Sequence, residues 1–199
     1  SDVRDIGKIA GVKDVAPIVL GSTKVVYQNI SKSRSIVGTL TAYSSIRNTK
    51  TVKGEFFHDV DNEGNRRAAV LGWNLADELF GQTDPIGKTI RINGQAFKVY
   101  GVAEKKGGGF GGPQFDDYLF IPYSTYVDIF GDTKVSQIIV QARDKDVVQE
   151  VIASVKKLLL KRLKSDEFSV FETTEILKVI NQILGVLTLG LGGIAAISL

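Results

Sequence analysis

Four side chains between positions 58 and 63 have the types that metal binding or acid–base catalysis requires: His58, Asp59, Asp61 and Glu63. An imidazole beside carboxylates can act as a general base with its orienting acid. All four belong to one polar, turn-rich stretch, and no second cluster of such residues accompanies them in the sequence. We therefore interpret them as loop residues exposed to solvent, and a membrane-anchored hydrolase that uses His58 is kept as an alternative.

The composition excludes most other enzyme chemistries. The 199 residues include no cysteine and one histidine, His58. This excludes a cysteine nucleophile, a thiolate metal site and a zinc site built from several histidines. A serine–histidine–carboxylate triad would depend on His58 alone. We expect a domain without catalytic residues, cofactor or metal.

The charge pattern does not indicate a nucleic-acid partner. The chain has 25 Lys and Arg against 22 Asp and Glu, a formal net charge of +3. The basic residues are scattered except for a helical run between Lys156 and Lys164, which is typical of a solvated helix face. Nucleic-acid binding favours basic stripes interleaved with exposed aromatic residues, whereas the aromatic residues here occupy apolar-periodic positions. We expect no nucleic-acid partner.

Two further stretches are candidates for a ligand or a partner. Asp116 and Asp117 are interpreted as the start of a strand, because the ligand spacing of an EF-hand loop is absent. The glycine-rich stretch 105–113 lacks the ending of a P-loop and the opening of a dinucleotide-binding helix, so we expect a surface loop. Phe110 within it is predicted to anchor a partner and to order on binding. The predicted interface residues are Gly108, Gly109, Phe110 and Gly111.

Hydrophobic periodicity predicts a mixture of helices and strands. The dipeptide Asn93-Gly94 between two β-type runs is a strong hairpin signal, because both residues accept positive φ. Core positions are assigned to Trp73, Phe80, Phe97 and Phe120. Predicted helices cover 2–11, 73–80, 124–130 and 147–163, the last capped by Asp144, and predicted strands cover 15–20, 24–28, 35–43, 67–72, 88–92, 95–102, 117–122, 135–142 and 168–171.

The order of these elements predicts an α+β fold with two subdomains. Residues 1–55 and 133–172 are expected to form a membrane-proximal split βαβ-type subdomain. Residues 56–132 are expected to form a smaller α+β subdomain inserted between its two halves.

The C-terminal segment has the composition of a membrane helix. From Val179 to Leu199 there is no charged residue, and the apolar run that starts at Ile183 approaches the length that crosses a bilayer. Its glycines suit close helix packing in a membrane. We predict that 173–199 is the start of a truncated transmembrane helix. Because the chain begins at Ser1 and has no methionine, we expect a processed product or a fragment of a longer protein.

Several stretches, taken in order, resemble the MacB-type ABC transporter permeases in the domain called the MacB-like periplasmic core domain. The middle motif is long and specific, since it runs from Leu79-Phe80-Gly81 through Asp84-Pro85-Ile86-Gly87-Lys88 to Ile92-Asn93-Gly94-Gln95. The other stretches are 9–17, 70–72, 97–102 and 192–199.

The resemblance implies a fold with a porter-like subdomain joined to membrane helices and an inserted sabre-like subdomain. It implies a place outside the cytoplasmic membrane, between the first and second of four transmembrane helices, the first preceding Ser1. It also implies a permease that works as a dimer, with ATP hydrolysed by a separate or fused cytoplasmic ATPase domain, and with an extracytoplasmic adaptor of the membrane-fusion type as partner. Export or translocation of a substrate is the expected function. A peptide-sensing permease domain is an alternative.

Overall fold

The computed structural model describes residues 2–107, 115–131, 133–174 and 182–187. The chain divides into two compact units, Ser1–Val148 and Gln149–Leu199. The helices and strands, in chain order, are α1 (Asp2–Gly7), β1 (Val12–Tyr27), β2 (Ile30–Thr39), α2 (Ala42–Ile46), β3 (Thr51–Gly54), α3 (Asp59–Glu63), β4 (Ala68–Leu71), α4 (Trp73–Phe80), β5 (Thr89–Ile92), β6 (Gln95–Ala103), the 3₁₀ turn η1 (Phe115–Asp117), β7 (Leu119–Pro122), α5 (Tyr123–Phe130), β8 (Gln137–Ala142) and α6 (Val148–Leu159).

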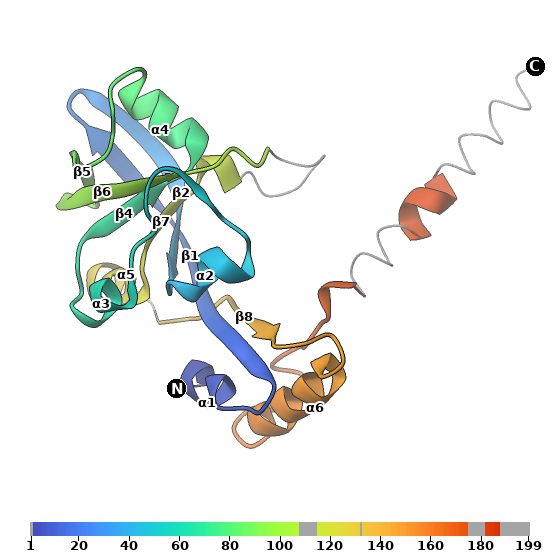
Figure 1. Cartoon of the computed structure of the whole chain (residues 1–199). Coiled ribbons are helices and arrows are strands. Elements are labelled where there is room, and N and C mark those ends of the chain that lie inside the picture. The colour runs from blue at the N-terminus through green and yellow to red at the C-terminus, as the bar shows by residue number, and fades with distance from the viewer. Residues whose placement is uncertain (1, 108–114, 132, 175–181, 188–199) are drawn as a thin grey trace, which may run out of the picture. The chain divides into compact units, whose positions relative to one another are not determined.

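The first unit is built around a mixed sheet that closes on itself. Its strands follow the order β2-β7-β4-β6-β5-β1, and β1 pairs again with β2 (Figure 1). The pairs β2–β7 and β4–β6 are parallel, and the remaining pairs of this ring are antiparallel. β8 extends the sheet along β1, and β3 pairs with β6. The α+β class predicted from the sequence is confirmed.

Burial on both faces distinguishes these strands from half-exposed ones. All four residues of β4 are buried, as are the four of β7. One set of their side chains packs inside the ring with Leu75 and Leu79 of α4, and the other packs with Tyr43, Phe56 and Phe57. Because apolar side chains are removed from water on both sides of the sheet, the ring is a compact, well-ordered body.

The strand β1 differs from the prediction because two expected runs, 15–20 and 24–28, form one strand from Val12 to Tyr27. Gly21 lies in the gap between these two predicted runs. A Cβ atom at Gly21 would lie 2.4 Å from the hydroxyl oxygen of Tyr126. A Cβ atom at Gly38, on the paired strand β2, would lie 2.6 Å from the Cβ atom of Tyr126. The two glycines therefore admit a helix side chain against the sheet and do not turn the chain.

The predicted helices and the predicted hairpin are largely confirmed. α4 and α5 form where periodicity placed them, and Asn93 and Gly94 adopt φ of 49° and 78° between β5 and β6. Phe80, Phe97 and Phe120 are buried, but Trp73 is 38% exposed, so its assignment to the core was wrong. The buried face of α4 consists of Leu75, Ala76, Leu79 and Phe80, and a rotation of about 100° per residue leaves Trp73 at the edge of that face, beside Phe80.

Three other predictions about local structure are wrong. The strand expected over 35–43 ends at Thr39, and Ala42–Ile46 form α2. Residues 168–171 are not a strand, and no strand of the described residues pairs with them. Asp144 does not cap α6, which begins at Val148. The Oδ1 atom of Asp144 instead accepts a hydrogen bond from the Asp146 amide at 3.4 Å.

The second unit contains α6, which has the amphipathic character that its periodicity predicts: Val151 and Val155 are buried while Lys156 and Lys157 are exposed. Most of the expected membrane segment 173–199 lies outside the described residues, which omit 175–181 and 188–199. Within the described part of the chain, no helix has the length and apolar character to cross a membrane.

The expected division into subdomains 1–55 with 133–172 and 56–132 stays a prediction. The pairing β1–β5 and the pairing β2–β7 each join a strand of the first range to a strand of the inserted range. The two ranges therefore share one sheet.

Candidate functional site

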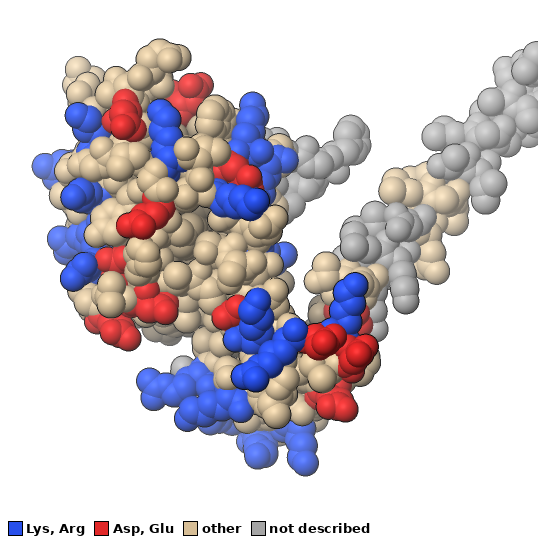
Figure 2. All heavy atoms as spheres, in the orientation of Figure 1, with Lys and Arg blue, Asp and Glu red and all other residues tan. Residues whose placement is uncertain are grey.

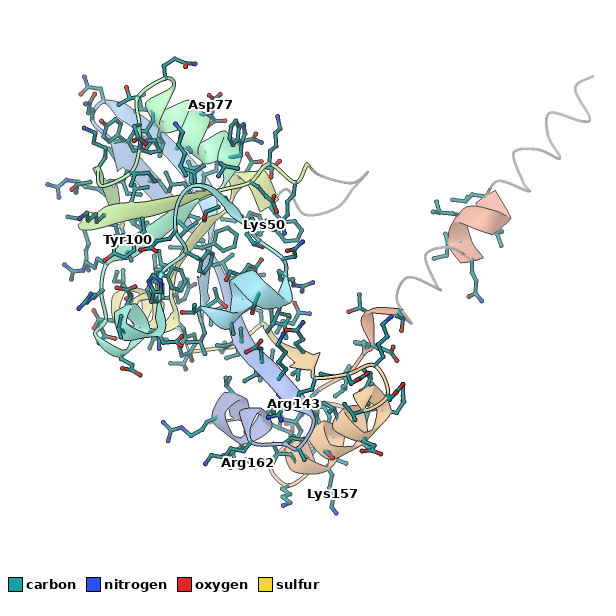
Figure 3. All side chains as sticks on the ribbon, viewed as in Figure 1. Lys50, Asp77, Tyr100, Arg143, Lys157 and Arg162 are labelled. Carbon is teal, nitrogen blue, oxygen red and sulfur yellow. The ribbon has the colours of Figure 1, made fainter. Side chains whose placement is uncertain are left out.

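The cluster 58–63 forms a short helix and not the solvated loop that we expected. Asp61 is only 2% exposed, and its Oδ2 accepts a hydrogen bond from the His58 amide at 2.8 Å. Its Oδ1 lies 3.5 Å from Arg66 and 3.5 Å from the hydroxyl of Tyr100, which is labelled on β6 in Figure 3. A buried carboxylate with these partners holds the start of α3 against the sheet. Asp59 and Glu63 are exposed.

His58 does not have the surroundings of a catalytic base. Its Nε2 lies 3.7 Å from Glu55 and its Nδ1 lies 3.9 Å from Asp61, and its side chain is 55% exposed. Among the described residues, no serine or threonine hydroxyl hydrogen-bonds to the imidazole, and no three metal-binding side chains gather into a site. The geometry here is that of the first turn of a helix.

Hydrogen bonds to Asp116 hold the chain at the base of the glycine-rich stretch. The Lys106 and Gly107 amides donate to Oδ1 and Oδ2 of Asp116, each at 2.8 Å. Asp116 is 4% exposed and lies in the turn η1 before β7. A carboxylate that accepts two backbone N–H groups fixes both ends of the intervening segment. Asp116 therefore closes the base of a loop, which the sequence interpretation as the start of a strand missed.

The four predicted interface residues of this loop, Gly108, Gly109, Phe110 and Gly111, lie outside the described residues. Their role in partner binding stays a prediction.

A cavity of about 190 Å³ lies beside the loop base. Phe115, Phe120 and Ala103 supply its apolar wall. The Lys106 ammonium donates to the Arg47 carbonyl at 2.8 Å and to Thr49 Oγ1 at 3.1 Å. The polar lining comes from α2 and the chain after it, from the end of β6 and from η1: Tyr43, Arg47, Thr49, Glu104, Lys106 and Asp116.

Backbone pairing joins the segments around this cavity. The Glu104 amide donates to the Lys50 carbonyl at 2.9 Å, and the Lys50 amide lies 3.4 Å from Glu104 Oε1. Lys50, labelled in Figure 3, marks this side of the cavity. Tyr43 lies on the other side, with its ring centroid 5.3 Å from that of Phe120.

Burial changes the titration of two groups in the cavity. It raises the pKa of the Tyr43 hydroxyl, and the nearby Arg47 guanidinium offsets part of this rise. Burial also lowers the pKa of Lys106, against the opposite effect of Glu104. The folded state therefore favours a protonated phenol at Tyr43.

Sequence reasoning missed Tyr43, Arg47, Thr49 and Lys106 as a group. They come from segments nearly sixty residues apart, as the Lys106–Thr49 contact shows, and no local motif connects them. The only local signal was the glycine run that follows Lys106. Blue and red side chains are both spread over the face of the first unit drawn in Figure 2.

The sequence of residues 1–158 matches the profile of the MacB-like periplasmic core domain. The chain belongs to this family. The resemblance found in the motifs is thereby confirmed, and the family is that of the outer domains of ABC transporter permeases.

Curated relatives support the assignment. The macrolide export ATP-binding/permease protein MacB of Bdellovibrio bacteriovorus is 34% identical over 96% of this chain and 30% of its own length. The pyoverdine export ATP-binding/permease protein PvdT of Pseudomonas savastanoi is 32% identical over all of this chain and 31% of its own length. The chain thus spans about a third of the relatives that it matches.

Solved structures show the same fold. The periplasmic region of MacB from Actinobacillus actinomycetemcomitans superposes with a TM-score of 0.79 at 23% identity, over 90% of this chain and 81% of that one. The extracellular domain of the ABC-type transporter YknZ from Gram-positive bacteria gives a TM-score of 0.69 at 24% identity, over 79% of this chain and 80% of that one.

Proposed function

We propose that this chain is the extracytoplasmic domain of an ABC transporter permease in the cell membrane, and that it couples cytoplasmic ATP hydrolysis to movement outside the membrane during export of a substrate. The observation that carries the proposal is the family match over residues 1–158. Relatives that are export ATP-binding/permease proteins support it. The domain itself is non-catalytic, and ATP is bound by a separate or fused ATPase domain.

The closed sheet suits this role. A ring of strands that is packed on both faces moves as one body, so a shift of the membrane helices displaces the whole ring without unfolding it. The expected partners are a cytoplasmic ABC ATPase, a second permease copy and an extracytoplasmic adaptor of the membrane-fusion type.

The loop that Asp116 closes is the proposed contact with the adaptor. Its base is held by two hydrogen bonds of 2.8 Å, and Phe110 between its ends is an aromatic side chain of the kind that dominates interface energetics. The Gly107 amide donates one of these two hydrogen bonds. A deletion that tests the contact should therefore keep Gly107 and remove only residues 108–112.

The test uses the full-length permease with its ATPase and adaptor in lipid nanodiscs. Phe110→Ala and deletion of 108–112 should each weaken adaptor binding, with the single substitution costing on the order of tenfold in affinity, while the domain keeps its thermal stability. His58→Ala serves as the matched control and should change neither adaptor binding nor export. Unchanged adaptor affinity in both loop variants would refute the contact, and a loss of hydrolytic activity in His58→Ala would favour a hydrolase.

A further inference from the structure

The cavity beside the loop base contains a buried polar group without a partner. Tyr43 is 3% exposed, and its hydroxyl makes no hydrogen bond within the described part of the chain. Among the described residues, the side-chain polar atoms that have no partner and are sealed from solvent belong to Arg34, Gln95 and Gln141. The Tyr43 hydroxyl is not one of them, so it is open to the cavity. A phenol that is otherwise buried normally has a hydrogen-bond partner. The hydroxyl is therefore open to a hydrogen-bond acceptor that enters the cavity.

Two cations lie at the same polar end. The Lys106 ammonium has three N–H donors and uses two of them, on the Arg47 carbonyl and on Thr49 Oγ1. Arg47 also lines the cavity, and its guanidinium has one described hydrogen bond, at 3.5 Å to Gln137 on β8. The third ammonium donor and the phenol are therefore left to donate to an added acceptor, with the positive charge of Arg47 nearby.

The acidic side chains of the cavity do not satisfy these donors. Both oxygens of Asp116 accept backbone N–H groups at 2.8 Å. Glu104 Oε1 lies 3.4 Å from the Lys50 amide. Two cations and two carboxylates therefore line the cavity, and donors of Lys106 and Tyr43 remain for an added acceptor.

The rest of the cavity is apolar and of suitable size for an aromatic ring. Its volume of about 190 Å³ exceeds that of an engineered apolar cavity of about 150 Å³ that binds benzene. Phe120 is buried and, with Phe115, offers ring surfaces against which a flat apolar group can pack.

We propose that this cavity is a binding site for a carboxylate carried on a small aromatic or apolar body. The carboxylate accepts from Lys106 and Tyr43, the positive charge of Arg47 adds attraction, and the body packs on Phe115 and Phe120. The site is independent of the proposed export function, because it needs only the first unit of the chain. The carboxylate belongs either to a free acid or to the C-terminus of a peptide.

Backbone amide shifts in the nuclear magnetic resonance spectrum of the full chain test the proposal, with phenylacetate as probe. Phenylacetate should shift the amides of Thr49, Glu104 and Asp116 in a saturable way, and phenylacetamide should bind at least about tenfold more weakly because it lacks the charge. Acetyl-glycyl-phenylalanine is the second arm. Tighter binding of this peptide than of phenylacetate assigns the site to a peptide terminus, and the reverse assigns it to a free acid.

Variants separate this site from general attraction to a basic surface. Lys106→Met should weaken phenylacetate binding about tenfold and Tyr43→Phe several-fold, since each loses a hydrogen bond to a charged group. Both changes keep the shape of the side chain, and the spectrum itself reports folding. Lys105→Met, the exposed neighbour, is the control and should leave affinity unchanged. Equal binding of acid and amide, or shifts confined to the basic run 156–164, would overturn the proposal.

Discussion

Asp116 stabilises the fold through hydrogen bonds that only an ionised carboxylate can accept in this arrangement. In Asp116→Asn, an amide NH₂ would face one of the two backbone N–H donors of Lys106 and Gly107, leaving a buried donor without a partner. We expect the free energy of unfolding to fall by about 1–3 kcal/mol. Urea denaturation measures this free energy, and Asp128→Asn, at an exposed position of α5, is the control. A loss no larger than that of the control would contradict this role.

Tyr43 makes stability depend on pH in the alkaline range. Burial raises its pKa above the ordinary value of 10.0, so the folded state keeps the phenol proton while the unfolded chain loses it. The unfolded state binds fewer protons above that pH, and the free energy of unfolding therefore falls as pH rises beyond about 10. Tyr43→Phe should remove this part of the fall. Urea denaturation at pH 8, 10 and 11 measures the difference between the two proteins, and identical slopes would contradict the assignment.

At the scale of elements, the sheet and α5 are matched through Gly21 and Gly38. A methyl group at Gly38 would lie 2.6 Å from Tyr126 Cβ, so Gly38→Ala should lower the free energy of unfolding by about 1–3 kcal/mol through overpacking. The loss should shrink, though not vanish, when Tyr126→Ala is already present, because Cγ and Cδ2 at 2.6 and 3.0 Å are removed while the Cβ atom stays. A double-mutant cycle by denaturation measures this coupling. Additive losses would show that the glycine is not required by the tyrosine.

Local signals predicted elements well where a turn or a helical stripe was involved. Asn93-Gly94 specified its hairpin, and the stripe that includes Ala76, Leu79 and Phe80 marked the buried face of α4. The predictions failed where the conformation of a residue depends on a partner that is distant in the sequence. Gly21 lies in the gap between two predicted runs but accommodates Tyr126, more than a hundred residues later.

The candidate site could not be predicted as a site for the same reason. Its polar residues belong to α2, the end of β6 and η1, which the pairing of β3 with β6 and of β2 with β7 brings together. Strand periodicity states which face of a strand is buried but not which strand it pairs with. Asp61 shows the same limit, because its burial depends on Tyr100 of β6 and not on its own polar stretch.

For the whole molecule, the proposed coupling to ATP hydrolysis requires the first unit to move as a rigid body when the ATPase binds ATP. The chain is free of cysteine, so single cysteines introduced here give unique labelling sites within it. Asp128→Cys on α5 is exposed and reports on movement between the two copies of a permease dimer. Asp77→Cys combined with Asp128→Cys, on α4 and α5 of the same unit, reports on changes within it.

The most direct test is therefore pulsed electron spin resonance on the full-length permease with its ATPase in nanodiscs. We predict that the distance between Asp128→Cys labels on the two copies shifts between the nucleotide-free state and the ATP-trapped state. The distance between positions 77 and 128 within one copy should stay the same. An unchanged distance between copies, in a sample that hydrolyses ATP, would contradict the coupling of ATP hydrolysis to movement outside the membrane.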